Sequence, residues 1–133
     1  MSTFIATVSK IENCDSLNVV KFNFHEISLS MMSLDLNAKV KIGSRVKLLV
    51  KPTHIALAKE FTGEVSYSNQ LPATIVSLEN GTLLSSIELE LFDAKLESVI
   101  TLNSSKRMKL KIGDRVMAFI KASDLSIGEV LDD

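Results

Sequence analysis

The chain has 133 residues, of which 46% are hydrophobic and 23% are charged, and its formal net charge is −1. This composition predicts a folded domain, and a charge so close to zero argues against a broad basic surface for nucleic acid. The apolar runs are shorter than the ~20 residues of a membrane-spanning helix, and the N-terminus lacks the pattern of a secretion signal. The single Cys14 excludes an internal disulfide, and one cysteine with two histidines offers no zinc framework. We therefore expect a soluble protein of the cytoplasm.

Short strands are the elements that the sequence predicts near its beginning. Apolar runs between turn-forming residues place these strands at 5–11, 19–24, 27–32 and 45–50. A turn-like segment at 33–38 separates the third strand from the fourth.

The second half of the chain predicts the same order of elements. A turn signal at Asn80-Gly81 ends its first strand, and the S-I-E-L-E-L sequence alternates with the period of a half-buried strand. Asn103-Ser104-Ser105 precedes a run at 106–110 that is too short for a full helix but fits one capped helical turn. The expected strands lie at 72–78, 86–91, 96–101 and 115–121.

The two halves repeat each other. KVKIGSRVKLLVKPTHIAL at 39–57 matches KLKIGDRVMAFIKASDLSI at 109–127, whereas AxVxKIEN at 6–13 matches AxIVSLEN at 73–80 with a slightly shorter offset. The difference between the offsets means that the second copy has three extra residues, which we expect in the turn at 92–96. A repeated unit of about 65 residues with short strands and one helical turn predicts an all-β protein of two tandem OB-like Greek-key barrels. The expected divisions are a first unit at 1–60, a linker at 61–66 and a second unit at 67–133.

Three stretches of the second copy resemble the Mop unit, the molybdate-binding form of the TOBE domain. They are SYSNQLPATIVSLENG at 66–81, VITLNSS at 99–105 and LKIGDRVMAFIKASDLSIG at 110–128, whereas the Mop unit typically begins S-A-R-N-Q-L and ends V-x-A-x-I-K-A-S-D-V. Two such units in tandem form the di-Mop arrangement of stand-alone molybdate-binding proteins and of the sensing half of molybdate-responsive regulators. The resemblance covers the whole chain, closely over 66–128 and more loosely over 2–57, and it implies OB-like barrels that bind oxyanions where units of different chains meet.

The chemistry of the residues is compatible with an oxyanion ligand and with no metal cation. Molybdate and tungstate are tetrahedral dianions whose oxygens only accept hydrogen bonds, so a site needs several donors, fixed positive charge and no nearby carboxylate. The hydroxyls and free N–H groups at the strand-to-helix junction 101–105 are suited to this task. The resemblance assigns binding to the hydroxyls of Thr101 and Ser104, to the segment Lys121, Ala122 and Ser123, to the motif start at Ser66, Ser68 and Asn69, and to Lys51 of the first copy.

Two departures from the family motif change the expected site. Ser68 occupies the place of the motif's arginine, so a bidentate cation is missing. In the first copy, Met31 and Leu34 are expected at the positions of the two hydroxyl ligands, while Lys51 is retained and Thr53 replaces the motif's serine. The first copy is therefore predicted to donate a lysine to a shared site.

Other interpretations of the same residues stay open. Ser, Thr and Asn at 101–105 are what any strand-to-helix junction uses for capping, and Lys51 and Lys121 also fit solvated strand ends. His25 and His54 have no Asp or Cys partner at a metal-binding spacing, so surface positions are expected for both. No nucleophile elbow, P-loop, dinucleotide fingerprint or HExxH motif is present, so we expect no enzyme.

Three classes of function follow. The resemblance implies binding of molybdate or tungstate for intracellular molybdenum homeostasis, through storage or as the sensing domain of a regulator. The alternative is a structural or regulatory TOBE dimerisation domain of a transporter ATPase without a tight ligand. A nucleic-acid-binding OB fold would need aromatic stacking platforms and a basic groove, and the six Phe and one Tyr are mostly in core-like positions.

We expect a homo-oligomer, a dimer or a trimer, with the oxyanion sites at the contacts between chains. A barrel of about 65 residues has little core of its own, and the chain is expected to contact neither nucleic acid nor a membrane. The apolar residues expected to pack between chains are Val19, Phe22 and Phe24 in the first copy and Ile87, Leu89 and Leu91 in the second.

Overall fold

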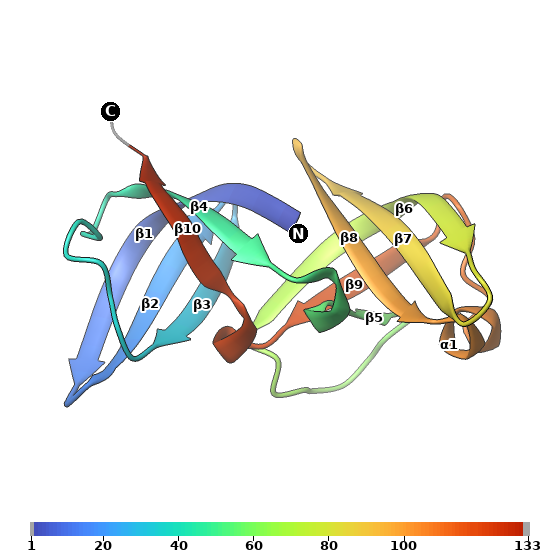
Figure 1. Ribbon diagram of the computed structural model, residues 1–133, viewed down its shortest axis with the longest axis horizontal. Coiled ribbons are helices and arrows are strands. Elements are labelled where there is room, and N and C mark those ends of the chain that lie inside the picture. Colours follow the sequence, from blue (N-terminus) through green and yellow to red (C-terminus); the bar gives the residue numbers. More distant parts are fainter. Residues whose placement is uncertain (1, 132–133) are drawn as a thin grey trace.

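Residues 2–131, the part of the chain described by a computed structural model, form two five-stranded antiparallel sheets (Figure 1). The first sheet has the order β10-β4-β1-β2-β3 and the second has the order β5-β9-β6-β7-β8. The predicted mainly-β fold class is confirmed. The strands are β1 (Ser2–Cys14), β2 (Leu17–Phe24), β3 (Ile27–Ser33), β4 (Arg45–Val50), β5 (Ala56–Ala58), β6 (Asn69–Asn80), β7 (Leu84–Leu91), β8 (Ala94–Thr101), β9 (Arg115–Ile120) and β10 (Ser126–Leu131), and the helical segments are α1 (Leu102–Arg107) and the 3-10 turns η1 (Pro52–His54) and η2 (Ala122–Asp124).

The two copies exchange their last strands. Strand β5, which ends the first copy, pairs with β9 of the second copy through Ala56↔Phe119 and Ala58↔Met117. Strand β10, which ends the second copy, pairs with β4 of the first copy along its whole length, and Figure 1 shows the two side by side. Each sheet is therefore built from both halves of the chain. The sequence did not predict either exchanged strand.

The exchanged strand β10 approaches β4 closely at Gly128. This glycine lies at a shift of the β10–β4 register, and a Cβ atom there would lie 2.7 Å from the side chain of Leu49. We expect Gly128→Ala to lower the free energy of unfolding by about 1–3 kcal/mol, the usual cost of overpacking, as measured by urea denaturation. In the Leu49→Ala background the same change should cost much less. An equal cost in both backgrounds would show that the close approach is not the cause.

The repeated K-I-G sequence has a structural role in both copies. The N–H of Gly43 donates to the carbonyl of Val8 at 2.8 Å, and the N–H of Gly113 donates to the carbonyl of Ile75 at 2.8 Å. Both glycines have positive φ, 93° and 96°, which favours glycine at these positions. Each turn is thereby joined to the first strand of its copy, where the pairing with the second strand shifts register. The lysines that precede the glycines are exposed.

The three extra residues of the second copy lie in α1, so the prediction that placed them at 92–96 is wrong. The offset that relates 6–13 to 73–80 also relates the cross-strand pair Asn18↔Ser33 of the first copy to the pair Ser85↔Ile100 of the second. The two copies therefore stay in step up to the end of β3 and of β8. The first copy has no helix at the place of α1. An insertion in a tight hairpin would change its register, whereas one helical turn of about 3.6 residues leaves the strands in place. Leu34, and not Met31, therefore corresponds to Thr101.

A continuous hydrophobic core fills the space inside the two curled sheets of residues 2–131. The sequence predicted that six apolar residues pack between chains. This prediction is wrong for most of the six, because the curled sheets and the exchanged strands bury these side chains within one chain. Phe22, Phe24, Ile87, Leu89 and Leu91 are buried in the single chain, and Val19 is half-buried. No helix among the described residues is long and apolar enough to cross a membrane.

Candidate functional site

The two lysine segments come together at the centre of the molecule. In each segment a lysine follows the last residue of the strand and precedes a 3-10 turn, Lys51 before η1 and Lys121 before η2. Turn η1 of the first copy contacts β8 of the second, and turn η2 of the second copy contacts β3 of the first. His54 and Asp124, which occupy equivalent positions in the two turns, face each other at 3.7 Å between Nδ1 and Oδ1. An approximate two-fold axis that relates the copies therefore passes between these turns.

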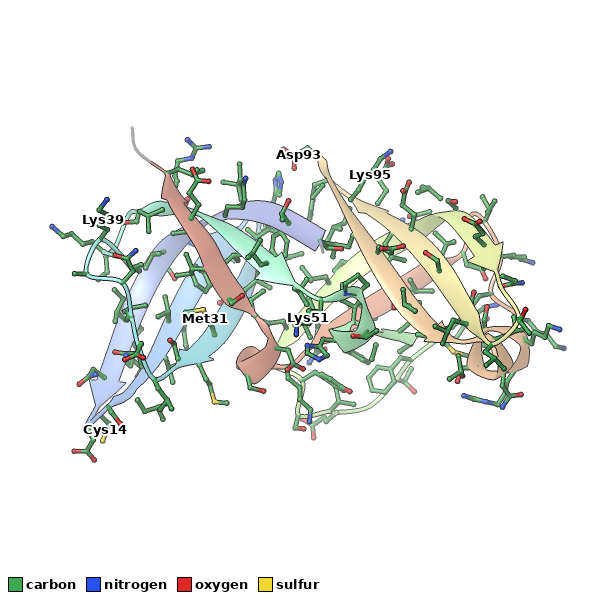
Figure 2. The ribbon with its side chains drawn as sticks, in the orientation of Figure 1. Cys14, Met31, Lys39, Lys51, Asp93 and Lys95 are labelled. Carbon is green, nitrogen blue, oxygen red and sulfur yellow. The ribbon has the colours of Figure 1, made fainter. Side chains whose placement is uncertain are left out.

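Cavities on either side of this axis pair a lysine of one copy with a hydroxyl residue of the other. A cavity of about 190 Å³ is lined by Lys51 of the first copy and Ser123 of the second. Another, of about 280 Å³, is lined by Lys121 of the second copy and Thr53 of the first. Figure 2 shows Lys51 near the junction of the two halves. The structure thus places the two predicted lysine donors in neighbouring cavities that share His54 and Asp124.

The predicted hydroxyl ligands form a separate cluster at the start of α1. The N–H of Ser104 donates to Thr101 Oγ1 at 3.2 Å, and the Thr101 hydroxyl donates to Ser104 Oγ at 3.0 Å. Thr101 is therefore the N-cap of α1, which is the capping role that the sequence left open. Arg107 Nη2 also donates to Ser104 Oγ, at 3.2 Å, and so brings a cation to this cluster. The cavity of Lys121 reaches β8 at Ile100, one residue before Thr101.

The segment at the start of the Mop-like motif is divided between solvent and core. Ser66 and Ser68 are exposed, but the Asn69 side chain is fully buried. Its Oδ1 accepts from the N–H of Ser30 at 2.7 Å, and its Nδ2 donates to the carbonyl of Ser30 at 3.0 Å. Asn69 therefore fixes β6 of the second copy to β3 of the first.

Ser2 makes the equivalent contact from the first copy to the second. Its Oγ accepts from the N–H of Glu97 on β8 at 2.8 Å. In the repeat, Ser2 corresponds to Asn69 and Glu97 corresponds to Ser30, with the same offset that relates 6–13 to 73–80. The two contacts together form a pair of reciprocal clamps between the copies.

Tyr67 is a site residue that the sequence reasoning missed. It lies between the two exposed serines and lines the same cavity as Lys121. Its ring stacks on Phe119 with a centroid distance of 5.1 Å and an interplanar angle of 9°. Its position inside the motif was visible in the sequence, but its stacking partner on β9 was not. Tyr67 therefore connects the motif start to the lysine segment.

Both histidines meet an aspartate of the other copy. His25 Nε2 lies 3.0 Å from Asp93 Oδ1, and the imidazole of His25 stacks on Phe92 at 4.2 Å. Because each of these aspartates lies in the opposite half of the chain from its histidine, no local spacing predicts either contact. Within residues 2–131, no three His, Cys, Asp or Glu side chains are arranged to hold a metal ion.

The His25–Asp93 contact predicts a pH dependence of stability. The hydrogen bond from His25 holds the pKa of Asp93 below its ordinary value of 3.8. Because the folded-state pKa is the lower one, this contribution is present above about pH 4 and is lost as the pH falls through the folded-state pKa. We expect Asp93→Ala to lower the melting temperature at pH 5–7 and to have little effect near pH 2. A deficit that persists undiminished at pH 2 would contradict this origin.

Comparisons with known proteins give the following relatives. The TOBE domain model matches residues 66–127. The probable molybdenum-pterin-binding protein of Haemophilus influenzae is 30% identical over 66 residues, which cover 49% of this chain and 96% of that protein. The molybdenum import ATP-binding protein ModC of Brucella abortus (strain 2308) is 28% identical over 104 residues, or 77% of this chain. The chain spans 29% of the length of that relative.

Among solved structures, the fold is similar to that of the cytoplasmic molybdate-binding protein ModG in a form with molybdate bound. The TM-score is 0.88 at 24% sequence identity, and the match covers 95% of this chain and 94% of that chain. This similarity confirms the predicted tandem arrangement of OB-like barrels.

Proposed function

Because this chain belongs to the TOBE domain family, in its tandem Mop form, we propose that it binds molybdate or tungstate. The observation that carries the proposal is the meeting of the two lysine segments. In each of the two central cavities, a lysine of one copy lies with a hydroxyl residue of the other, Lys51 with Ser123 and Lys121 with Thr53. A fixed cation with neutral hydroxyl donors is the chemistry that a tetrahedral dianion requires.

The lysine in each of these cavities favours an anionic ligand, and one carboxylate opposes it. Asp124 lines both cavities and disfavours an anion, so the lysine and hydroxyl donors must outweigh its carboxylate, which lies 3.7 Å from the imidazole of His54. Neutral donors suit a fully ionised oxyanion, whereas a protonated phosphate would place a donor against a donor. Ligand size would then separate molybdate from sulfate, which carries the same charge.

The hydroxyl cluster of α1 supports a site that a second chain completes. Thr101 and Ser104 already hydrogen-bond to each other, and neither lines the Lys121 cavity of its own chain. In the proposed assembly, a dimer or trimer, this cluster meets a lysine segment of a neighbouring chain, and each site repeats once per chain. Light scattering should show that molybdate stabilises the assembly by mass action. A monomer of 14.6 kDa that binds one oxyanion tightly would contradict the shared site.

The proposed role is binding in the cytoplasm, for storage or sensing of the oxyanion, and not catalysis. The names of the relatives, a molybdenum-pterin-binding protein and a molybdate-binding protein, support this role. The alternative, a TOBE domain that packs and dimerises without a tight ligand, is favoured by the alignment with the transporter protein ModC.

Isothermal titration calorimetry separates these two proposals. The full chain should release or absorb heat with molybdate and tungstate, and should bind sulfate more weakly. Thermal unfolding provides a second readout, because a ligand that binds only the folded state raises the melting temperature. The absence of heat and of a thermal shift with both large oxyanions at millimolar concentration would refute oxyanion binding and leave the structural role.

Ser68→Arg tests the position of the motif start. The change restores the cation that the family motif has at this place, and Ser68 is exposed, so the fold should tolerate it. We expect molybdate affinity to increase by about 1.5–3 kcal/mol, the usual contribution of a charged hydrogen bond. Thr62→Arg, which adds the same single charge at another exposed position before the motif, is the control for a general effect of added charge. Equal affinity of the two variants would place Ser68 outside the site.

A further inference from the structure

A groove of about 530 Å³ lies on the outer face of the first sheet, away from the central cavities. Strands β1, β2 and β4 form its base, and the β7–β8 hairpin of the second copy forms one wall. Figure 2 shows Asp93 and Lys95 of this hairpin together at the junction of the two halves. Within the described part of the chain, the residues that line this groove are all different from those that line the lysine cavities.

The lining of the groove carries more cations than carboxylates. Arg45 and Lys47 reach it from β4, and Lys95 reaches it from β8. Asp93 is the one carboxylate among its described lining residues, and it is held by the hydrogen bond with His25. The two lysines lie near carboxylates outside the groove, at 3.9 Å from Glu129 and 3.7 Å from Glu88. These distances are too long for hydrogen bonds, so the ammonium groups keep donors for another acceptor.

The repeat shows that the fold does not require the two lysines of the groove, whereas Arg45 is matched by Arg115 in the second copy. The cross-strand pair Ile5↔Lys47 of the first copy corresponds to Pro72↔Met117 in the second. The pair Thr7↔Asn23 corresponds to Thr74↔Glu90. The same sheet therefore forms with an apolar residue in place of Lys47 and a carboxylate in place of Asn23. Lys95 of the second copy likewise corresponds to Ser28 of the first. Neither lysine is shared by the two copies, so packing of the sheet does not account for them.

We propose that this groove binds a phosphorylated small molecule of nucleotide size. Its volume falls within the range of about 300–1,000 Å³ that is usual for organic ligands, and it far exceeds the space that a single tetrahedral oxyanion occupies. Arginine and lysine are the side chains that recognise phosphate oxygens. Thr7 and Asn23 add neutral hydrogen-bonding groups, and Ile5, which is 45% exposed, provides an apolar contact for a ring.

The test is calorimetric titration of the full chain with ADP, with inorganic phosphate and adenosine as separate probes. ADP is expected to bind more tightly than either probe, because the phosphates and the ring contact different parts of the groove. The double variant Lys47→Met/Lys95→Ser carries the residues that the opposite copy has at these positions, so it should fold. Its affinity for ADP should fall at least tenfold, consistent with the loss of charged hydrogen bonds.

The control is Lys10→Met, which removes an exposed lysine of the same sheet outside the groove. It should leave ADP binding unchanged, and molybdate binding should be unchanged in both variants. The proposal is overturned if ADP does not bind at millimolar concentration or binds the double variant as tightly as the wild type. It is also overturned if the double variant loses molybdate binding, since the groove would then belong to the oxyanion site. A double variant that changes only the oligomeric state would overturn it too, by assigning these cations to a contact between chains.

Discussion

Replacing Lys121 by alanine is expected to weaken molybdate binding by about 1.5–3 kcal/mol, or roughly 10- to 150-fold, the range for a charged hydrogen bond. Lys121 is exposed at the end of β9, so the fold should persist. Thr101→Ala should weaken binding less, because a neutral hydroxyl contributes about 0.5–1.5 kcal/mol. Calorimetry gives the affinity, and circular dichroism confirms that the variants fold.

Lys51→Ala decides whether the first copy contributes to binding. If the two central cavities act as related sites, this change should reduce affinity or stoichiometry by an amount comparable to that of Lys121→Ala. Lys41→Ala, another exposed lysine of the first copy that does not line either lysine cavity, is the matched control and should have no effect. Full affinity and stoichiometry in Lys51→Ala would restrict binding to the second copy.

Asn69→Ala is expected to lower the free energy of unfolding by about 2–4 kcal/mol. The change removes two hydrogen bonds and leaves the N–H and carbonyl of Ser30 without their partner in a half-buried position. Urea denaturation measures the loss, and Ser2→Ala, which removes the single reciprocal contact to Glu97, should cost about half as much. The resemblance to the Mop unit assigned Asn69 to the oxyanion. A variant of normal stability that loses molybdate binding would favour that ligand role over the clamp.

Local patterns predicted the parts of the fold that depend on neighbouring residues. The alternation of 86–91 and the apolar runs near 19–24 and 45–50 specify strands because period-two patterns depend only on local sequence. The observed strands β2, β4 and β7 lie at these places. A capped helical turn after the strand at 96–101 was also predicted, but it was placed at 106–110, whereas α1 begins at Leu102 with Thr101 as its cap.

Features that depend on long-range pairing were not predictable in the same way. Strand β5 is very short, and its identity as a strand depends on β9, which belongs to the other half of the chain. The insertion in α1 was misplaced because the offset of the repeat changes between Asn80 and Lys109 without a sequence marker at the point of change. The sequence did not predict that Lys51 and Ser123 line one cavity within a single chain, which they do because η1 and η2 face each other across the internal axis.

Strand exchange also determines when the fold can be completed during synthesis. The first sheet receives its edge strand β10 about 75 residues after β4 has been synthesised, because β4 must wait for residues 126–131. Contacts of such long sequence separation slow folding, and until they form, the open edge of β4 is available for pairing with other chains. Proteolytic cleavage in the irregular segment 59–68 should leave two fragments that stay associated, since each holds a strand in the sheet of the other.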